Sequence, residues 1–115
     1  MLAIKGQVYM ASFCVDMRKS IDGLSIIVAD EFHKNPTDGA FYVFINKALD
    51  KIKILYFDKN GFALWYKRLE KGKFKLPKYD GKIYTLDDAQ LRWLLDGLDI
   101  KKLKKTTELS YESFS

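Results

Sequence analysis

The feature that most constrains this fold is the tetrapeptide DKNG at residues 58–61, which stands between the runs KIKILYF (51–57) and FALWYKRL (62–69). An aspartate that opens a turn can accept hydrogen bonds from the turn amides, and a glycine at its end tolerates positive φ. Runs rich in β-branched and aromatic residues are typical of strands. The segment therefore predicts an antiparallel β-hairpin, against which the rest of the chain must pack.

The type of turn decides which side chains share a face of this hairpin. A three-residue loop with a glycine bulge pairs Lys53 with Lys67 and puts Trp65 on the same mixed surface. A tight two-residue Asn-Gly loop regroups these side chains, because a shift of one residue changes which strand faces coincide. The sequence is compatible with both registers.

Two segments show the spacing of helices. Between residues 16 and 35 apolar side chains recur every three or four positions, and Asp16 is the expected N-cap. The segment 85–97 begins with Thr85 as its expected N-cap, and Gly97 is the expected left-handed terminator. We therefore predict two α-helices.

Residues 7–13 and 41–46 have the composition of further strands. Together these elements predict an α+β fold: a small antiparallel β-meander of four to five strands with two α-helices packed on one face. A chain of 115 residues supports one core, so we expect a single α+β domain over residues 1–104. Residues 105–115, rich in Ser and charged residues, are predicted to be a flexible C-terminal tail.

The positive charge is concentrated in the middle of the chain. The formal net charge is +5, and residues 47–82 hold eleven Lys and Arg against four Asp and Glu, whereas residues 1–46 hold four against five. A basic region of this kind is compatible with nucleic acid, an anionic membrane surface or an acidic protein. The alternative is a solvated lysine-rich face that serves solubility.

The side chains of common active sites are scarce. One histidine, His33, and one cysteine, Cys14, exclude a zinc site of histidines and cysteines, and Cys14 is expected to be buried and inert. The acidic residues fall at turns and helix ends that already explain them. We therefore predict a protein that is not an enzyme and has no catalytic residues, no metal site and no cofactor. It is expected to be cytoplasmic and without membrane partners.

Four segments resemble the small TnpB, or Orf2-like, accessory proteins of the insertion-sequence-sixty-six group of bacterial transposons. The segments are DMRKSIDGL (16–24), FYVFIN (41–46), KIKILYFDKNGFALWYKRLEKGKF (51–74) and LDDAQLRWLLDGLDI (86–100). The resemblance implies a protein that acts beside a separate transposase carrying the catalytic acidic residues. The loop at residues 46–51 is less basic here than the arginine-rich link of relatives.

These observations lead to two hypotheses of function. The first is a non-catalytic accessory protein of transposition that binds transposon DNA through a basic aromatic hairpin, with the transposase and other element-encoded proteins as partners. The alternative is a protein-protein adaptor of the transposase complex with no direct DNA contact. For Trp65, stacking on a base competes with burial under a helix. The expected nucleic-acid-binding residues are Arg18, Lys19, Lys53, Trp65, Lys67, Arg68, Lys71, Lys73 and Lys75.

Overall fold

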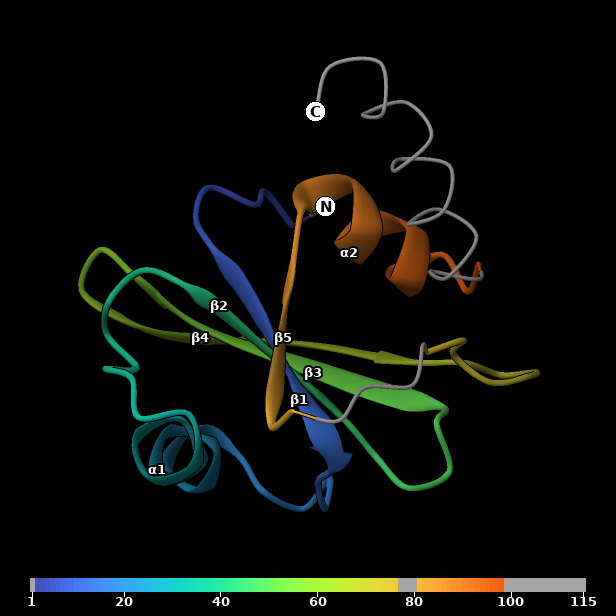
Figure 1. Cartoon of the computed structure of the whole chain (residues 1–115), viewed down its shortest axis with the longest axis horizontal. Coiled ribbons are helices and arrows are strands. Elements are labelled where there is room, and N and C mark those ends of the chain that lie inside the picture. Colours follow the sequence, from blue (N-terminus) through green and yellow to red (C-terminus); the bar gives the residue numbers. More distant parts are fainter. Residues whose placement is uncertain (1, 77–80, 99–115) are drawn as a thin grey trace.

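Seven elements follow one another in residues 2–76 and 81–98, the part of the chain that this computed structural model describes (Figure 1). They are β1 (Val8–Cys14), α1 (Ile21–Glu31), β2 (Phe41–Ile45), β3 (Lys51–Asp58), β4 (Gly61–Arg68), β5 (Ile83–Leu86) and α2 (Asp88–Leu95). The predicted α+β class, with five strands and two helices, is confirmed. The predicted tail at residues 105–115 and the boundary after residue 104 lie outside the described residues.

The five strands form a mixed sheet in the order β4-β3-β2-β1-β5. β1 and β2 are parallel, and the other neighbouring strands are antiparallel. The expectation of a purely antiparallel meander was therefore wrong for one pair. The reason is α1, which carries the chain back to the edge where β1 began, so that β2 runs in the same direction as β1.

The helices cover opposite faces of the sheet, as Figure 1 shows, and not one face as predicted. Leu24 and Val28 of α1 pack on one side, and Leu91 and Leu94 of α2 pack on the other. The cause is visible in β2, because all five of its residues are buried. A strand that is apolar on both faces needs a cover on each.

The hairpin of β3 and β4 has a two-residue loop, with Asp58 paired to Gly61 and Phe57 to Phe62. Lys59 and Asn60 form the loop, and Lys59 has a φ of 53°. The observed register is therefore neither of the two considered from the sequence, because the loop residues are Lys-Asn and not Asn-Gly. It groups the side chains by face as the two-residue alternative does.

The helix ends differ from the sequence predictions in two of three places. Ser20, and not Asp16, is the N-cap residue of α1. Asp16 begins a separate turn, in which the backbone N–H of Lys19 donates to the Asp16 carbonyl. Thr85 lies in β5, so a capping box of Asp87 and Gln90 begins α2 instead. Gly97, with a φ of 78°, is the left-handed residue expected after α2.

Candidate functional site

The topology brings distant basic residues to one edge of the sheet. β1, β2 and β4 end at this edge, while β3 and β5 begin there. The start of β3 lies beside the end of β4, because Lys51 pairs with Arg68. The start of β5 lies beside the end of β1, because the N–H of Ser12 donates to the carbonyl of Lys82. Two further bonds, from Leu69 N to Asp50 O and from Phe74 N to Leu49 O, tie the segment after β4 to the loop after β2. We call this edge the basic end. Its cationic residues are Arg18, Lys19, Lys47, Lys51, Lys53, Lys67, Arg68, Lys71, Lys73, Lys75 and Lys82.

The segment after β4 presents three of these cations to solvent. Lys71, Lys73 and Lys75 are exposed, whereas Phe74 between them is only 2% exposed and belongs to the core. The backbone N–H of Phe74 donates to the Leu49 carbonyl at 2.7 Å, which fixes the segment on the sheet edge. Among the described residues, the three lysines form no hydrogen bond or ion pair. Their ammonium groups are therefore available to an anionic ligand.

Lys53 and Lys67 are used differently, because each donates to backbone carbonyls. Lys53 Nζ lies 2.8 Å from the carbonyl oxygens of both Met17 and Lys19, in the segment that leads into α1. Lys67 Nζ lies 2.6 Å from the carbonyl oxygen of Leu95, at the end of α2. Both side chains thus satisfy carbonyl groups that have no partner within a helix or strand.

Lys53 and Trp65 do not share a surface, in contrast to the three-residue-loop prediction. With the observed register, Trp65 lies opposite Ile54 and Lys67 opposite Ile52, on the side covered by α2. Lys53 lies opposite Tyr66 on the side of α1. The structure therefore divides the predicted aromatic and basic face between the two sides of the sheet.

Trp65 itself is half-buried and packs against the α2-side core. A small cavity of about 80 Å³ lies beside it, lined also by Leu2, Ile4 and Leu95. The next residue, Tyr66, faces the other side and is 49% exposed. Tyr66, which the sequence did not single out, is thus the more accessible aromatic side chain of the hairpin.

Arg18 and Arg68 each hold a neighbouring carboxylate. The guanidinium of Arg18 donates to both carboxylate oxygens of Asp16, with the shortest distance at 2.7 Å, while its side chain stays 91% exposed. This pairing, aided by the backbone N–H of Arg18, lowers the pKa of Asp16 to about 2. Arg68 donates to Glu70 at 2.9 Å. Exposed pairs of this kind contribute little to stability.

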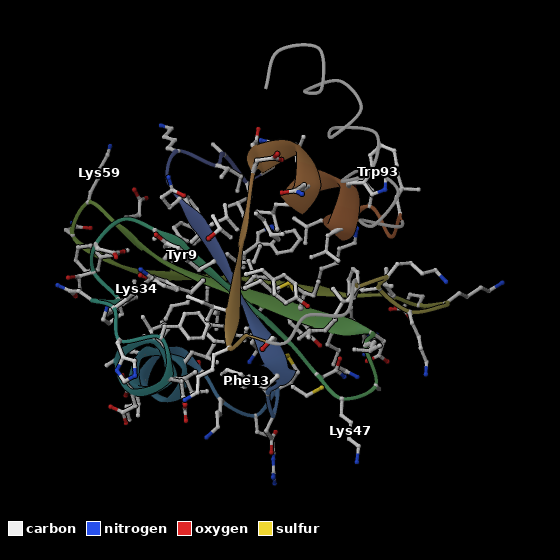
Figure 2. The ribbon with its side chains drawn as sticks, in the orientation of Figure 1. Tyr9, Phe13, Lys34, Lys47, Lys59 and Trp93 are labelled. Carbon is white, nitrogen blue, oxygen red and sulfur yellow. The ribbon has the colours of Figure 1, made fainter. Side chains whose placement is uncertain are left out.

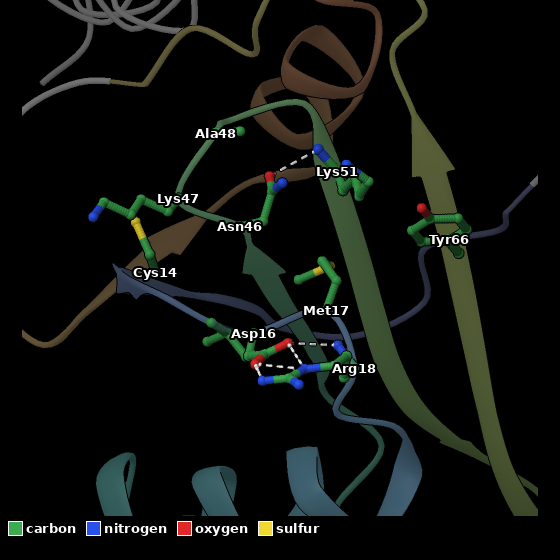
Figure 3. A pocket seen from close by; sticks show the side chains of 10 residues that line it. Cys14, Asp16, Met17, Arg18, Asn46, Lys47, Ala48, Lys51 and Tyr66 are labelled. Carbon is green, nitrogen blue, oxygen red and sulfur yellow. Dashed lines mark hydrogen bonds and ion pairs between the residues drawn. The ribbon is translucent and has the colours of Figure 1, made fainter.

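An open hollow of about 720 Å³ lies outside the carboxyl ends of β1 and β2 (Figure 3). Its lining comes from the end of β1 and the turn after it, from the loop after β2, and from the basic ends of β3 and β4. The lining residues are Cys14, Val15, Asp16, Met17, Arg18, Asn46, Lys47, Ala48, Lys51 and Tyr66. Cys14 is exposed and not buried as predicted, because it is the last residue of β1, where the strand leaves the core.

The loop after β2 is held rigid by Asn46. Its side-chain oxygen accepts from the N–H groups of Asp50 and Lys51 at 3.0 and 2.9 Å, and its amide donates to Asp50 at 2.7 Å. The contact with Asn46, together with the ammonium group of Lys51, lowers the pKa of Asp50. Lys47 points away from this loop into solvent (Figure 2).

Sequence reasoning missed Lys47, Lys51, Lys82 and Tyr66 as members of this region. Lys47 and Lys51 belong to the loop at residues 46–51, whose low basicity argued against a role in binding, and Tyr66 and Lys82 stand just outside the run from Lys67 to Lys75. The signal that locates them is topological: residues at the ends of parallel strands, and at the starts of their antiparallel neighbours, gather at one edge.

The described residues contain neither a cluster of metal ligands nor a helix that could span a membrane. In residues 2–76 and 81–98, no group of three or more His, Cys, Asp or Glu side chains is placed to hold a metal ion. Neither α1 nor α2 has the length and apolar character that crossing a membrane requires.

Comparison with known proteins identifies the family. A family model described as IS66 Orf2 like protein matches residues 6–105. Uncharacterized protein y4hO of Sinorhizobium fredii (strain NBRC 101917 / NGR234) is 32% identical over 100 residues, which is 87% of each chain. Uncharacterized protein y4jC of the same strain is 29% identical over 99 residues, 86% of this chain and 85% of the relative. No solved structure matches the chain significantly.

The match covers the segments that carried the resemblance, so the resemblance is confirmed. Members of this family are accessory proteins of transposition. The chain belongs to the IS66 Orf2-like family.

Proposed function

We propose that this protein is a non-catalytic accessory factor of transposition that binds transposon DNA with its basic end. The observation that carries the proposal is the gathering of cations from five segments at one edge of the sheet. Within this edge, Lys71, Lys73 and Lys75 are exposed and anchored by the buried Phe74. A row of ammonium groups that have no partner among the described residues suits a DNA backbone, because binding releases the counterions of each contacted phosphate.

The residues predicted from the sequence contribute unequally to this proposal. Lys71, Lys73 and Lys75 are direct phosphate contacts, and Arg18 and Arg68 join them by exchanging their carboxylate partners for phosphate. Lys19 is exposed next to Arg18. Lys53 and Lys67 act indirectly by holding the segments that carry the contacts. Trp65 has a packing role, and Lys47 extends the surface. Lys51 and Lys82 contribute less, because they are paired with Asp50 at 3.2 Å and with Glu31 at 2.8 Å.

Salt-dependent DNA binding by charge-matched variants tests the proposal. In the triple variant Lys71→Gln, Lys73→Gln and Lys75→Gln, we expect affinity for a short duplex to fall at least tenfold. The slope of log K against log salt should lose about two to three units, since each phosphate contact contributes about 0.9. Fluorescence anisotropy between low and moderate salt measures both quantities.

The matched control removes three charges from the other side of the molecule. Lys5, Lys34 and Lys59 lie away from the basic end, and Figure 2 shows Lys34 and Lys59 on the opposite side from Lys47. Their Gln variant has the same net charge as the test variant, so it should keep the wild-type salt slope. Equal losses in the two variants would mean that total charge, and not the basic end, determines binding.

The adaptor hypothesis predicts a different outcome. β4 is an outermost strand of the sheet, so its free side can pair with a strand of another protein. If the wild-type chain binds neither terminal-repeat nor random DNA at low salt but forms a complex with the transposase, the adaptor function replaces the DNA-binding proposal.

A further inference from the structure

The hollow at the carboxyl ends of β1 and β2 combines apolar and positively charged lining residues. One part of its wall is apolar and aromatic, made by Val15, Met17 and the ring of Tyr66. The rim carries the positive charges of Arg18, Lys47 and Lys51. In open α/β sheets, ligands bind outside the carboxyl ends of parallel strands, which is the position of this hollow.

The volume and charge of the hollow limit its ligand. About 720 Å³ falls in the range of small-molecule sites, roughly 300–1,000 Å³. The carboxylate of Asp16 also lines it, but the bidentate contact with Arg18 compensates this charge. Lys51 is shared with Asp50 at 3.2 Å, whereas Lys47 forms no hydrogen bond or ion pair with any described residue. The site is therefore suited to a flat, apolar group that carries a phosphate.

The aromatic wall is held in place before any ligand arrives. Lys53 Nζ, fixed by the carbonyls of Met17 and Lys19, lies 5.8 Å from the centroid of the Tyr66 ring. This is within the range of a cation–π contact. Tyr66 is nevertheless 49% exposed, so much of its surface remains free for a ligand.

We infer that this hollow receives one unpaired nucleotide of a DNA strand, with its base against Tyr66 and its phosphate near Lys47. The inference rests on the proposed DNA binding and specifies the form of DNA. A base within a duplex is stacked on both faces and cannot lie against the ring, so the site favours a single strand or an unpaired end. Stacking of bases on aromatic side chains supports such binding in single-strand-binding proteins.

The test compares a fluorescein-labelled oligothymidylate with a duplex of equal length, using the full chain and anisotropy. Tyr66→Leu should weaken binding to the single strand about tenfold and change binding to the duplex less than twofold. Tyr66→Phe retains the ring and should bind the single strand as the wild type does. Phe62→Leu is the matched control, since Phe62 lies on the same face of β4 at its other end.

The possible failures can be told apart. If the wild type binds neither DNA, the proposed function fails and the nucleotide site fails with it. If the wild type binds both DNAs and Tyr66→Leu weakens neither, or weakens both equally, the basic end binds DNA but the nucleotide site is wrong. Circular dichroism of each variant verifies that the fold is retained, and binding of the Lys47→Gln variant gives a second reading if Tyr66→Leu does not fold.

Discussion

Lysines that look alike in the sequence have separate physical roles in the hairpin and the segment after it. Lys71, Lys73 and Lys75 alternate with Gly72 and Phe74 and remain exposed. Lys53, two residues from the start of β3, has instead both of its hydrogen bonds directed at backbone carbonyls. Basic composition alone does not separate a cation that stabilises the fold from a cation that is available to a ligand.

This difference predicts unequal effects of the two substitutions on stability. Lys53→Met keeps the apolar stem but removes both hydrogen bonds. We expect it to lower the free energy of unfolding by about 1–2 kcal/mol. Hydrogen bonds to charged groups are worth about 1.5–3 kcal/mol, but the freed carbonyls regain some hydrogen bonds to water. Lys71→Met, at an exposed position without partners, should stay within about 0.5 kcal/mol of the wild type. Urea unfolding followed by circular dichroism measures both. Equal effects would show that the Lys53 contacts contribute nothing to stability.

At the scale of the element, the turn of the β3–β4 hairpin sets which residues share a face. Lys59 occupies the first loop position with a φ of 53°, a conformation that costs an L-residue with a side chain about 1–2 kcal/mol. Its side chain is exposed, so nothing in the core offsets this cost. Two-residue hairpin loops accept such a cost because positive φ matches the twist of the strands.

Glycine at this position should therefore stabilise the hairpin. We expect Lys59→Gly to raise the free energy of unfolding by about 0.5–1 kcal/mol, the relief of strain being partly offset by the greater entropy of glycine in the unfolded chain. Leu49 also has positive φ, at 60°, but its side chain packs on the α2-side core, so Leu49→Gly should destabilise the protein. Thermal unfolding of both variants measures the contrast. A lower melting temperature for Lys59→Gly would contradict the argument.

The elements were largely predictable from the sequence, but their pairing was not. The strand runs, the two helices and Gly97 carry local signals of composition, spacing and capping. Half-buried residues follow one another without alternation from Gly61 to Trp65, so β4 offers no pattern that fixes its register. The parallel pairing of β1 with β2 depends on the path of α1 between them, which no short segment encodes.

The candidate site shows the same division. Arg18 with Lys19, and the cations from Lys67 to Lys75, form two clusters along the chain, which is why the sequence indicated them as candidates. Lys47 and Tyr66 were missed, since their approach to Arg18 depends on which strand ends share an edge. Lys53 and Trp65 share a surface only with a three-residue loop, one of the two loops compatible with the sequence, and the structure has a two-residue loop.

In the whole molecule, the sheet separates two cores. Leu24, Val28 and Leu55 belong to the cluster under α1, while Ile52, Ile54 and Leu94 belong to the cluster under α2. The basic end lies across this division, at the edge where both faces meet. Packing changes in one core therefore reach the other through the backbone of the sheet and not through shared side-chain contacts.

This separation predicts additive stabilities for changes on opposite faces. Leu24→Ala should cost about 2–5 kcal/mol and Ile52→Val about 0.5–1.5 kcal/mol, because both side chains are fully buried. The double variant should equal the sum within about 0.5 kcal/mol, as independent sites do. Ile52→Val combined with Leu91→Ala, both in the α2-side cluster, is the comparison in which coupling above about 0.5 kcal/mol is expected. Urea unfolding of the full chain gives all values, and coupling of 1 kcal/mol or more across the sheet would mean that the two cores behave as one.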